Sequence, residues 1–382
     1  MKNIFILAGE QSADLHTSEL LKHIKKLDSE INFWGIGGPL MQKQGFDAIF
    51  QFEKLSIIGF TEVLKHIGFF YQLIYKIRKE LIRRKPSLVI LVDYPGLNIR
   101  IAKITKQLKI PVLYYISPQV WAWKKNRIYK IKKFTNKIAV IFPFEKELYD
   151  EIGADVEFVG HPIAEEIKYK ISKEEFSKQY QLDMKKKWLA FLPGSRDVEI
   201  KRILPEIVKT IQALKKRKKN KFEFLVSRAE TVSKKQFYKI INPIKNDIKI
   251  IIESYELMKY SNLVISKSGT STLETGFIGT PMIVVYKTSM LSYIIAKHYI
   301  KIDMIALPNI ISGKKIVPEL IQKDVNQAKI IKNIDLILND NKNYEIIKKE
   351  LSILHDKLGN KKASQNLARI ALSIIDETEN KE

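Results

Sequence analysis

The sequence predicts an α/β protein made of two doubly wound, Rossmann-like domains. Short uninterrupted apolar runs, such as L-V-I-L-V at residues 88–92, are typical of parallel strands buried on both faces. Several of these runs are followed by a glycine- or hydroxyl-rich turn and then by a helical pattern. The same succession of apolar run, turn and helical pattern begins again after the Gly-His-Pro linker at residues 160–162. A chain of 382 residues is long enough for two full cores, so two consecutive doubly wound domains are expected.

The expected division of the chain has three parts. Residues 1–165 form an N-terminal Rossmann-like domain and residues 166–340 form a C-terminal one. Residues 341–382 read as helices that pack back on the N-terminal domain or reach a second subunit. For His161, in the linker, the role of a hydrogen-bonded turn residue is favoured over a catalytic role.

Each domain has its own series of expected strands and helices. The first contains strands at residues 3–8, 32–36, 88–92, 111–116, 137–142 and 156–159, with a helix at 13–27. The second contains strands at residues 188–192, 222–227, 248–252, 262–265 and 282–285, with helices at 199–216 and 272–277. Further helices are expected at residues 324–338, 344–358 and 361–376.

Composition narrows the functional class. The hydrophobic content of 45% and the charged content of 28% are those of a soluble globular protein. The chain has no cysteine, which excludes disulfides and thiolate zinc sites and is compatible with a cytoplasmic protein. No apolar stretch reaches the ~18–20 residues of a membrane span, and the first apolar run is too short for a signal peptide. The net charge of +24 suggests an anionic partner, although a bias toward lysine, isoleucine and asparagine would also raise it.

Asp93 is the candidate catalytic residue of the first domain. It ends the buried strand at residues 88–92 and is followed by Tyr-Pro-Gly. Open α/β sheets place ligands and chemistry at the carboxyl ends of their strands. The alternative role for Asp93 is that of a turn or helix-capping residue. The glycine cluster at residues 35–39 also follows a strand, but it lacks G-x-G-x-x-G and indicates a dinucleotide only weakly.

The loop at residues 268–271 is the candidate anion site of the second domain. Strand, small-residue turn and helix aim backbone N–H groups and the positive end of a helix at an anion. Ser268 and Thr270 supply hydroxyl donors, and Gly269 allows close backbone approach. Glu274 lies about one turn further on, within reach of a sugar diol. An ordinary capped helix is the alternative.

Two segments combine apolar or aromatic residues with positive charge. Residues 55–77 are apolar and aromatic and run into a basic stretch at 76–85, which is the pattern of an interfacial segment or of a buried helix with a solvated end. Residues 117–123 read S-P-Q-V-W-A-W and precede a lysine-rich run that extends to Lys137. Aromatic side chains beside a cationic helix suit a phosphate surface, either of lipid or of nucleic acid.

Eight motif blocks follow one another along nearly the whole chain: G-E-x-S-x-D at residues 9–14, G-G-P-x-M at 37–41, D-Y-P at 93–95, S-P-Q-V-W-A-W at 117–123, F-P-F-E at 142–145, L-P-G-S-R at 192–196, S-G-T at 268–270 and L-P-N at 307–309. In sequence and in order, these blocks resemble those of the lipid-A-disaccharide synthase family. The resemblance implies a two-domain GT-B glycosyltransferase that joins UDP-2,3-diacylglucosamine to 2,3-diacylglucosamine 1-phosphate through a β-1,6 bond and releases UDP. Ala13 stands where the first motif often has glycine, which stiffens that loop without removing a catalytic side chain.

The resemblance gives the candidate residues their roles. Asp93 becomes the base that activates the acceptor hydroxyl, with Glu10 as the alternative. Arg196 and the loop Ser268–Gly269–Thr270 hold the departing diphosphate, and Glu274 holds the ribose. Ser195 and Asn309 complete the expected UDP-sugar site. The chain has no D-x-D pair of the kind that holds Mg²⁺ on a nucleotide sugar, so transfer without a metal or other cofactor is expected.

The family implies a peripheral membrane enzyme of Gram-negative bacteria. The expected partners are the two lipid substrates and the anionic inner face of the cytoplasmic membrane, with a homodimer through the C-terminal helices and no nucleic acid. Another GT-B enzyme, such as a UDP-sugar epimerase or an undecaprenyl-linked transferase, would retain the loop at residues 268–270 without needing S-P-Q-V-W-A-W. A nucleic-acid-binding protein would explain the charge, but no recognised nucleic-acid motif is found.

Overall fold

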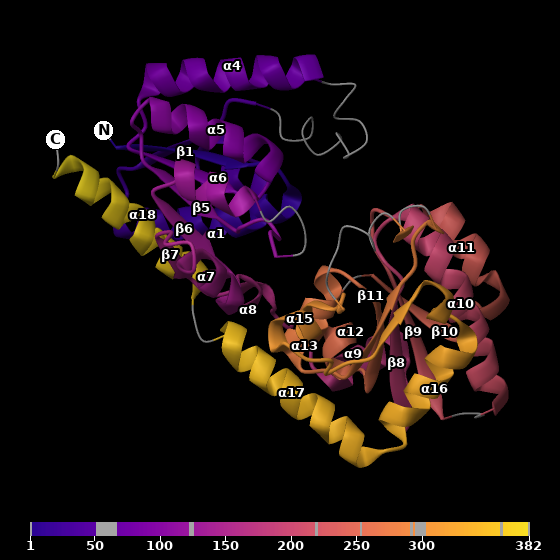
Figure 1. Cartoon of the computed structure of the whole chain (residues 1–382). Coiled ribbons are helices and arrows are strands. Elements are labelled where there is room, and N and C mark those ends of the chain that lie inside the picture. Colours follow the sequence, from indigo (N-terminus) through magenta and orange to yellow (C-terminus); the bar gives the residue numbers. More distant parts are fainter. Residues whose placement is uncertain are drawn as a thin grey trace. The chain divides into compact units, whose positions relative to one another are not determined.

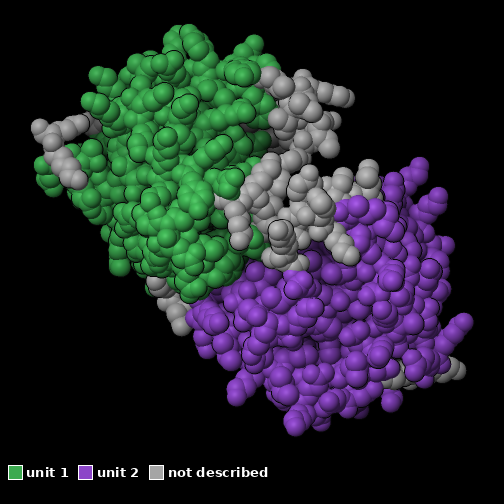
Figure 2. Space-filling model, in the orientation of Figure 1, with its two compact units in different colours: residues 1–162, 360–382 green, residues 163–359 purple. Residues whose placement is uncertain are grey.

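A computed structural model describes residues 2–50, 67–121, 126–217, 221–252, 254–290, 293–294, 303–359 and 362–380. The chain forms two compact units, coloured separately in Figure 2: unit 1 is residues 1–162 with 360–382, and unit 2 is residues 163–359. The first boundary therefore lies three residues before the expected one. The expected C-terminal helical segment is shared, because residues 341–359 belong to unit 2 and only its end returns to unit 1.

Unit 1 is built on a seven-stranded parallel sheet in the order β3-β2-β1-β4-β5-β6-β7 (Figure 1). The strands are β1 (Asn3–Ala8), β2 (Asn32–Ile36), β3 (Phe46–Ala48), β4 (Leu88–Val92), β5 (Val112–Tyr115), β6 (Lys137–Val140) and β7 (Val156–Phe158). All five residues of β4 are buried, as its apolar run predicts.

Helices cover both faces of this sheet. They are α1 (Gln11–Leu27), α2 (Pro39–Gln42), α4 (Ile67–Arg84), α5 (Pro95–Gln107), α6 (Arg127–Phe134), α7 (Pro143–Asp150) and α18 (Ala363–Glu379). One face carries α4, α5, α6 and α7, whose apolar side chains share a core with β1, β4 and β5. On the other face α18 packs against α1, although the two helices come from opposite ends of the chain (Figure 1).

Helix α4 contains the described part of the apolar segment expected at residues 55–77. Phe70, Leu73 and Ile77 are buried in the core of unit 1, whereas Tyr71 and Tyr75 are 68% and 71% exposed. The helix therefore has a core face and an exposed aromatic face. Residues 55–66 lie outside the described residues. Among the described helices, none combines the length and the apolar character needed to cross a bilayer.

Unit 2 is built on a six-stranded parallel sheet in the order β10-β9-β8-β11-β12-β13. The strands are β8 (Lys187–Leu192), β9 (Phe222–Arg228), β10 (Ile248–Ile252), β11 (Leu263–Lys267), β12 (Met282–Tyr286) and β13 (Glu319–Ile321). Strand β11 reaches two residues beyond the expected end, and α13 begins at Thr270, two residues before its expected start. The turn between them is therefore only Ser268 and Gly269.

The helices of unit 2 also cover both faces of its sheet. They are α8 (Ile163–Glu166), α9 (Lys173–Tyr180), α10 (Asp197–Arg217), α11 (Lys234–Ile241), α12 (Tyr255–Tyr260), α13 (Thr270–Ile278), α15 (Leu307–Ser312), α16 (Gln327–Leu338) and α17 (Asn341–Gly359), with short 3₁₀ turns η2 (Asn242–Ile244) and η3 (Gln322–Asp324). Helix α17 packs against α13, where the His355 ring lies 4.3 Å from that of Phe277 between centroids. This contact holds the expected helix of residues 344–358 in unit 2.

Candidate functional site

The strand order of unit 1 reverses between β1 and β4. From β1 the chain moves outward to β2 and β3, and from β4 it moves the other way to β5 and beyond. Ala8 pairs with Val92 at the carboxyl ends of these neighbouring strands. Glu10 and Asp93 follow directly, so both predicted acids border the crevice where doubly wound sheets bind their ligands.

Asp93 is held in an uncommon backbone conformation. Asp93 and Tyr94 both have positive φ, 47° and 40°, a left-handed conformation that non-glycine residues seldom adopt in succession. Two buried side chains hold the Asp93 carbonyl: Asn98 Nδ2 donates to it at 2.7 Å, and the Tyr114 hydroxyl donates to it at 2.7 Å. These hydrogen bonds therefore hold the Asp93 backbone in this conformation.

The electrostatics around Asp93 favour a proton acceptor. Burial raises the pKa of its carboxyl group to about 7, and the nearby negative charge of Glu10 acts in the same direction. The Tyr94 amide and His16 oppose the shift without cancelling it. A carboxylate whose pKa lies close to neutrality is well matched to general-base work. Glu10 itself is exposed, at the N-cap of α1.

Asp14 fixes the neighbouring glycine loop and was not among the predicted site residues. Its carboxylate is 2% exposed and accepts the backbone N–H groups of Gly38, Leu40 and Met41 at 2.9, 3.1 and 3.1 Å. A Cβ on Gly38 would lie 2.5 Å from Asp14 Oδ2, so only glycine fits there. The amides at the start of α2 are thus occupied by an internal carboxylate, which ties the glycine cluster to α1.

The motifs S-P-Q-V-W and F-P-F-E meet in one aromatic cluster beside β5 and β6. The Trp121 ring packs against Phe144, Phe142 stacks on Phe144, and the Phe142 ring lies 5.1 Å from that of His161 between centroids. Burial lowers the pKa of His161 to about 3, so its imidazole is neutral at physiological pH. This agrees with a structural role for His161. Residues 122–125, including the second tryptophan of the motif, lie outside the described residues.

Glu145 is a buried acid within that cluster. It is 1% exposed, and the Trp121 indole N–H donates to its Oε1 at 3.3 Å. Burial raises the pKa of Glu145 to about 8, against the opposing effects of Trp121 and of the Phe142 and Ile141 amides. Glu145 is therefore mostly protonated at neutral pH. The F-P-F-E motif was recognised in the sequence, but the protonation state follows only from burial.

Unit 2 has the same kind of crevice between β8 and β11. Its strand order reverses there, and Ser266 pairs with Leu192 close to the carboxyl ends. The turn Pro193-Gly194-Ser195-Arg196 follows β8, and the turn Ser268-Gly269 follows β11. The two loops predicted to hold a diphosphate thus lie beside each other at the ligand-binding edge of the sheet.

The loop after β11 presents the start of α13. The amides of Thr270 and Ser271 belong to the first turn of this helix, whose N–H groups have no partner inside the helix. The Ser268 hydroxyl donates to the carbonyl of Ile305 at 2.9 Å, which fixes the loop. Glu274 lies half-buried one turn along α13 from Thr270. Thr270 is exposed at the helix start, where an anion would lie.

The loop after β8 is fixed by Glu199, which was not among the predicted site residues either. The Ser195 amide donates to Glu199 Oε2 at 3.1 Å, and an Arg196 guanidinium nitrogen lies 3.8 Å from Oε1. Gly194 has φ 117°, and a Cβ on it would lie 2.4 Å from Glu199 Oε2. The Arg196 side chain is 80% exposed, so its head group has room to turn to a ligand.

Asn309 has a structural place in unit 2. It is fully buried; its amide nitrogen donates to the Val317 carbonyl and to Glu319, and its oxygen accepts the amides of Ile316 and Val317. With its hydrogen-bonding groups engaged in this way, it supports the segment between α15 and β13. The direct contact with a UDP-sugar that the L-P-N motif suggested stays a prediction.

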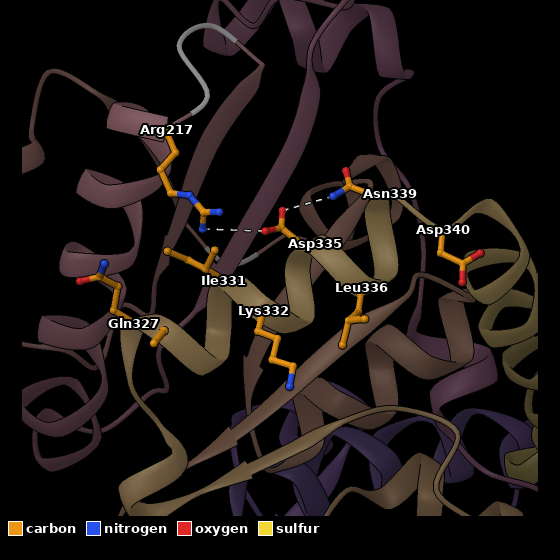
Figure 3. Close-up of a pocket in the computed structure, with 9 residues that line it drawn as sticks. Arg217, Gln327, Ile331, Lys332, Asp335, Leu336, Asn339 and Asp340 are labelled. Atoms are coloured by element: carbon orange, nitrogen blue, oxygen red, sulfur yellow. Dashed lines mark hydrogen bonds and ion pairs between the residues drawn. The ribbon is translucent and has the colours of Figure 1, made fainter.

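A surface groove of about 660 Å³ lies elsewhere in unit 2, between the end of α10 and the outer side of α16 (Figure 3). Arg217 points across it toward Asp335, at 3.9 Å, and Asn339 donates to the same carboxylate. The groove is lined by none of the predicted site residues. Among the described residues, no group of three or more His, Asp and Glu side chains is arranged to hold a metal ion.

Comparison with known proteins identifies the family. Residues 4–375 match the model of the lipid-A-disaccharide synthetase family. The chain is 38% identical to the lipid-A-disaccharide synthase of Syntrophus aciditrophicus, covering 98% of both chains. It is 33% identical to that of Trichlorobacter lovleyi, covering 99% of this chain and 98% of the relative. The chain belongs to the lipid-A-disaccharide synthase family.

Solved structures agree with the fold of a lipid-A-disaccharide synthase. A UDP-GlcNAc 2-epimerase from Neisseria meningitidis bound to UDP-GlcNAc superposes with a TM-score of 0.60 at 16% identity, covering 100% of both chains. The spinosyn rhamnosyltransferase SpnG superposes with a TM-score of 0.58 at 11% identity, covering 97% of this chain and 99% of the other. At these identities the likeness concerns the fold, and it confirms the GT-B architecture with two parallel-sheet domains.

Membership in the lipid-A-disaccharide synthase family makes this chain a glycosyltransferase of lipid A biosynthesis. It also confirms the recognition made from the eight motif blocks. The additional residues that the structure singles out, Asp14 and Glu199, each lie in the first turn of a helix that follows a motif glycine. An acid at that position, close to a glycine-rich turn, is the sequence signal that could have identified both.

Proposed function

We propose that this protein transfers the diacylglucosamine unit of UDP-2,3-diacylglucosamine to the 6-hydroxyl of 2,3-diacylglucosamine 1-phosphate, with inversion, and releases UDP. The observation that carries the proposal is the place of Asp93, at the carboxyl end of β4 where the strand order of unit 1 reverses. Burial there raises the pKa of its carboxyl group to about 7. Such a group can remove a proton from a primary alcohol as the alcohol becomes a nucleophile.

In the proposed reaction, Asp93 takes the proton of the acceptor hydroxyl. At the same time the oxygen of this hydroxyl bonds to the anomeric carbon of the donor sugar. The bond between that carbon and the diphosphate oxygen breaks at the same time, and its electron pair leaves with UDP. Attack from the face opposite to UDP gives the β-1,6 linkage. Glu10, beside Asp93, is the alternative base.

The donor's diphosphate is assigned to unit 2. The start of α13 offers amide donors and the positive end of a helix, and the exposed Arg196 offers a guanidinium group. Both favour the negative charge that develops as UDP departs. Glu274, one turn along α13, is assigned to the ribose diol, and Ser195 to the wall of the diphosphate site.

The test is to incubate the purified protein with both monosaccharide lipids and to analyse the products by mass spectrometry. We expect the disaccharide 1-phosphate together with one equivalent of UDP. An NMR coupling constant for the new anomeric proton should report the β configuration. Formation of an epimerised UDP-sugar without any disaccharide would instead favour the epimerase alternative.

We further infer that the protein works at the inner face of the cytoplasmic membrane as a peripheral protein. Both substrates carry acyl chains, so the enzyme must meet a lipid surface. Exposed Tyr71 and Tyr75 on α4 offer amphipathic aromatic contacts, and the exposed lysines of α6 offer positive charge. The net charge of +24 favours anionic lipid over neutral lipid.

A homodimer through the C-terminal helices remains a prediction. Helix α18 already buries apolar side chains against α1 within one chain, so a dimer would have to use other surfaces or exchange this helix. Multi-angle light scattering at several protein concentrations tests it directly.

A further inference from the structure

Lys267 lies at the point of unit 2 where the proposed diphosphate would bind. It is the last residue of β11, immediately before the loop of Ser268 and Gly269. Its Nζ lies 2.7 Å from Oε1 of Glu199, in the first turn of α10, so this ion pair spans the crevice between β8 and β11. Only 19% of the Lys267 side chain and 15% of the Glu199 side chain are exposed.

One carboxylate thus gathers donors from both sides of the crevice. Glu199 accepts the Ser195 amide at 3.1 Å, pairs with Lys267, and lies 3.8 Å from Arg196. A backbone amide with two cations is the donor set that proteins use for phosphate oxygens. The Glu199 carboxylate is therefore bound by a set of donors that would also suit a phosphate group.

Lys267 also touches the loop after β11. A Cβ on Gly269 would lie 3.6 Å from Nζ of Lys267, so the ammonium group lies against the open side of this glycine. The next residue, Thr270, begins α13 and its row of first-turn amides. An ammonium group carries three donors. One can remain on Glu199 while another reaches an oxygen bound beside Gly269.

We propose that Lys267 is a further diphosphate-binding residue of the donor site, and that Glu199 holds Lys267 and the Ser195–Arg196 turn in place before the nucleotide arrives. When the diphosphate binds, it shares Lys267 with Glu199 and draws the exposed Arg196 away from it. The inference rests on the proposed function for the identity of the ligand, a nucleoside diphosphate. The ammonium would act as a point charge on the phosphate oxygens as the bond to the sugar breaks.

The proposal is tested by calorimetric titration of the full-length protein with UDP and, separately, with uridine. Lys267→Met keeps the length of the side chain and removes its charge. We expect UDP affinity to fall about tenfold to a hundredfold, as for a lost hydrogen bond between charged groups, while uridine affinity stays unchanged. The salt dependence of UDP binding should also become shallower, because one cation is gone.

The control is Lys186→Met. Lys186 pairs with Glu223 at 3.0 Å and is similarly shielded, with 27% of its side chain exposed, but it lies just before β8, at the opposite edge of the same sheet. This variant should bind UDP like the wild type. Thermal unfolding without ligand compares the structural cost of the two substitutions.

A second variant, Glu199→Gln, keeps the size and an oxygen acceptor for the Ser195 amide but removes the competing negative charge. We expect it to bind UDP at least as tightly as the wild type. The proposal is overturned if Lys267→Met binds UDP normally, or loses UDP and uridine affinity to the same degree. If the wild type makes the disaccharide while Lys267→Met binds UDP normally, only the role of Lys267 fails. If the wild type does not bind UDP, both the proposed donor site and the role of Lys267 are rejected.

Discussion

At the scale of single residues, the environment of a carboxylate decides what it can do. Three acids of unit 1 illustrate this. Asp14 is buried but accepts three amides, Asp93 is partly buried next to another acid, and Glu145 is buried among aromatic rings. The first is positioned as a structural anion, the second is suited to accept a proton, and the third is mostly protonated at neutral pH.

Replacing Asp93 by asparagine tests the proposed base. The amide keeps the shape but cannot accept the proton, so kcat should fall by about 10²–10⁴-fold with UDP affinity unchanged. If Asp93 only formed the turn, asparagine would serve equally well and turnover would stay near normal. That result would transfer the role to Glu10.

The pH profile is the matching control. Only the ionised form of Asp93 can take a proton, so kcat/KM of the wild type should rise with pH and level off above about 7. The rise should disappear from the residual activity of the Asp93→Asn variant.

Glu145 should make the stability of unit 1 depend on pH. Its pKa is raised in the folded protein to about 8, so its contribution to stability is complete below about pH 4.5 and is lost as the pH rises through about 8. Glu145→Gln cannot ionise. We therefore expect the stability of the variant relative to the wild type to rise by roughly 3 kcal/mol from pH 6 to pH 9.

Urea denaturation of both proteins at the two pH values measures this difference. A stability difference that stays constant with pH would mean that Glu145 is solvated and ionised in the folded protein.

At the scale of elements, carboxylates in the first turn of a helix hold the loops at strand ends. Asp14 of α1 holds the turn between β2 and α2, and Glu199 of α10 holds the turn after β8. In each case a glycine, Gly38 or Gly194, has no space for a side chain because the carboxylate lies against it. Both units therefore place a helix carboxylate against a motif glycine at a strand end. In unit 1 this helix follows a neighbouring strand, whereas in unit 2 it follows the same strand as the turn.

Asp14→Ala should loosen the β2–α2 turn. Three amides would lose a charged acceptor in a buried place, so we expect the free energy of unfolding to fall by about 2–4 kcal/mol. Asp28→Ala is the control, because Asp28 accepts a single amide, from Glu30, in an exposed turn. Its cost should stay below about 1 kcal/mol. Equal losses in chemical denaturation would show that Asp14 has no special structural role.

At the scale of the whole molecule, positive charge is the dominant property. Lys130, Lys132 and Lys133 are exposed on α6, and each lysine close to an anionic surface contributes roughly 1 kcal/mol to binding. Replacing these three by glutamine should weaken binding to anionic liposomes in sedimentation assays. Binding of the wild type should weaken with salt without vanishing, because the exposed aromatic face of α4 contributes apolar contacts.

A triple glutamine variant of Lys234, Lys235 and Lys239 removes the same charge from α11 in unit 2, where these lysines are also exposed. It should retain more binding than the α6 variant. Equal binding of the wild type to neutral and anionic liposomes would remove the basic helix from the explanation.

The sequence by itself determined the fold class and placed both candidate sites at the carboxyl ends of strands. Apolar runs, turn residues and helical patterns are local features. The apolar composition of a strand such as Leu88–Val92 is enough to predict that it is buried. Because parallel strands direct their carboxyl ends to one edge, the positions of Asp93 and of the Ser268–Gly269 loop directly after apolar runs were enough to assign both to ligand crevices. The motif blocks then identified the family.

Tertiary structure alone decided what several of these residues do there. Asp14 meets Gly38, and Glu199 meets Lys267, only because the sheet brings separate loops together. Asn309 is buried and engaged in hydrogen bonds within unit 2, which its motif did not indicate. The pKa of Asp93 depends on burial and on Glu10, which lies far away in the chain. Desolvation and charge pairing are properties of surroundings assembled from distant segments, so a local sequence pattern does not contain them.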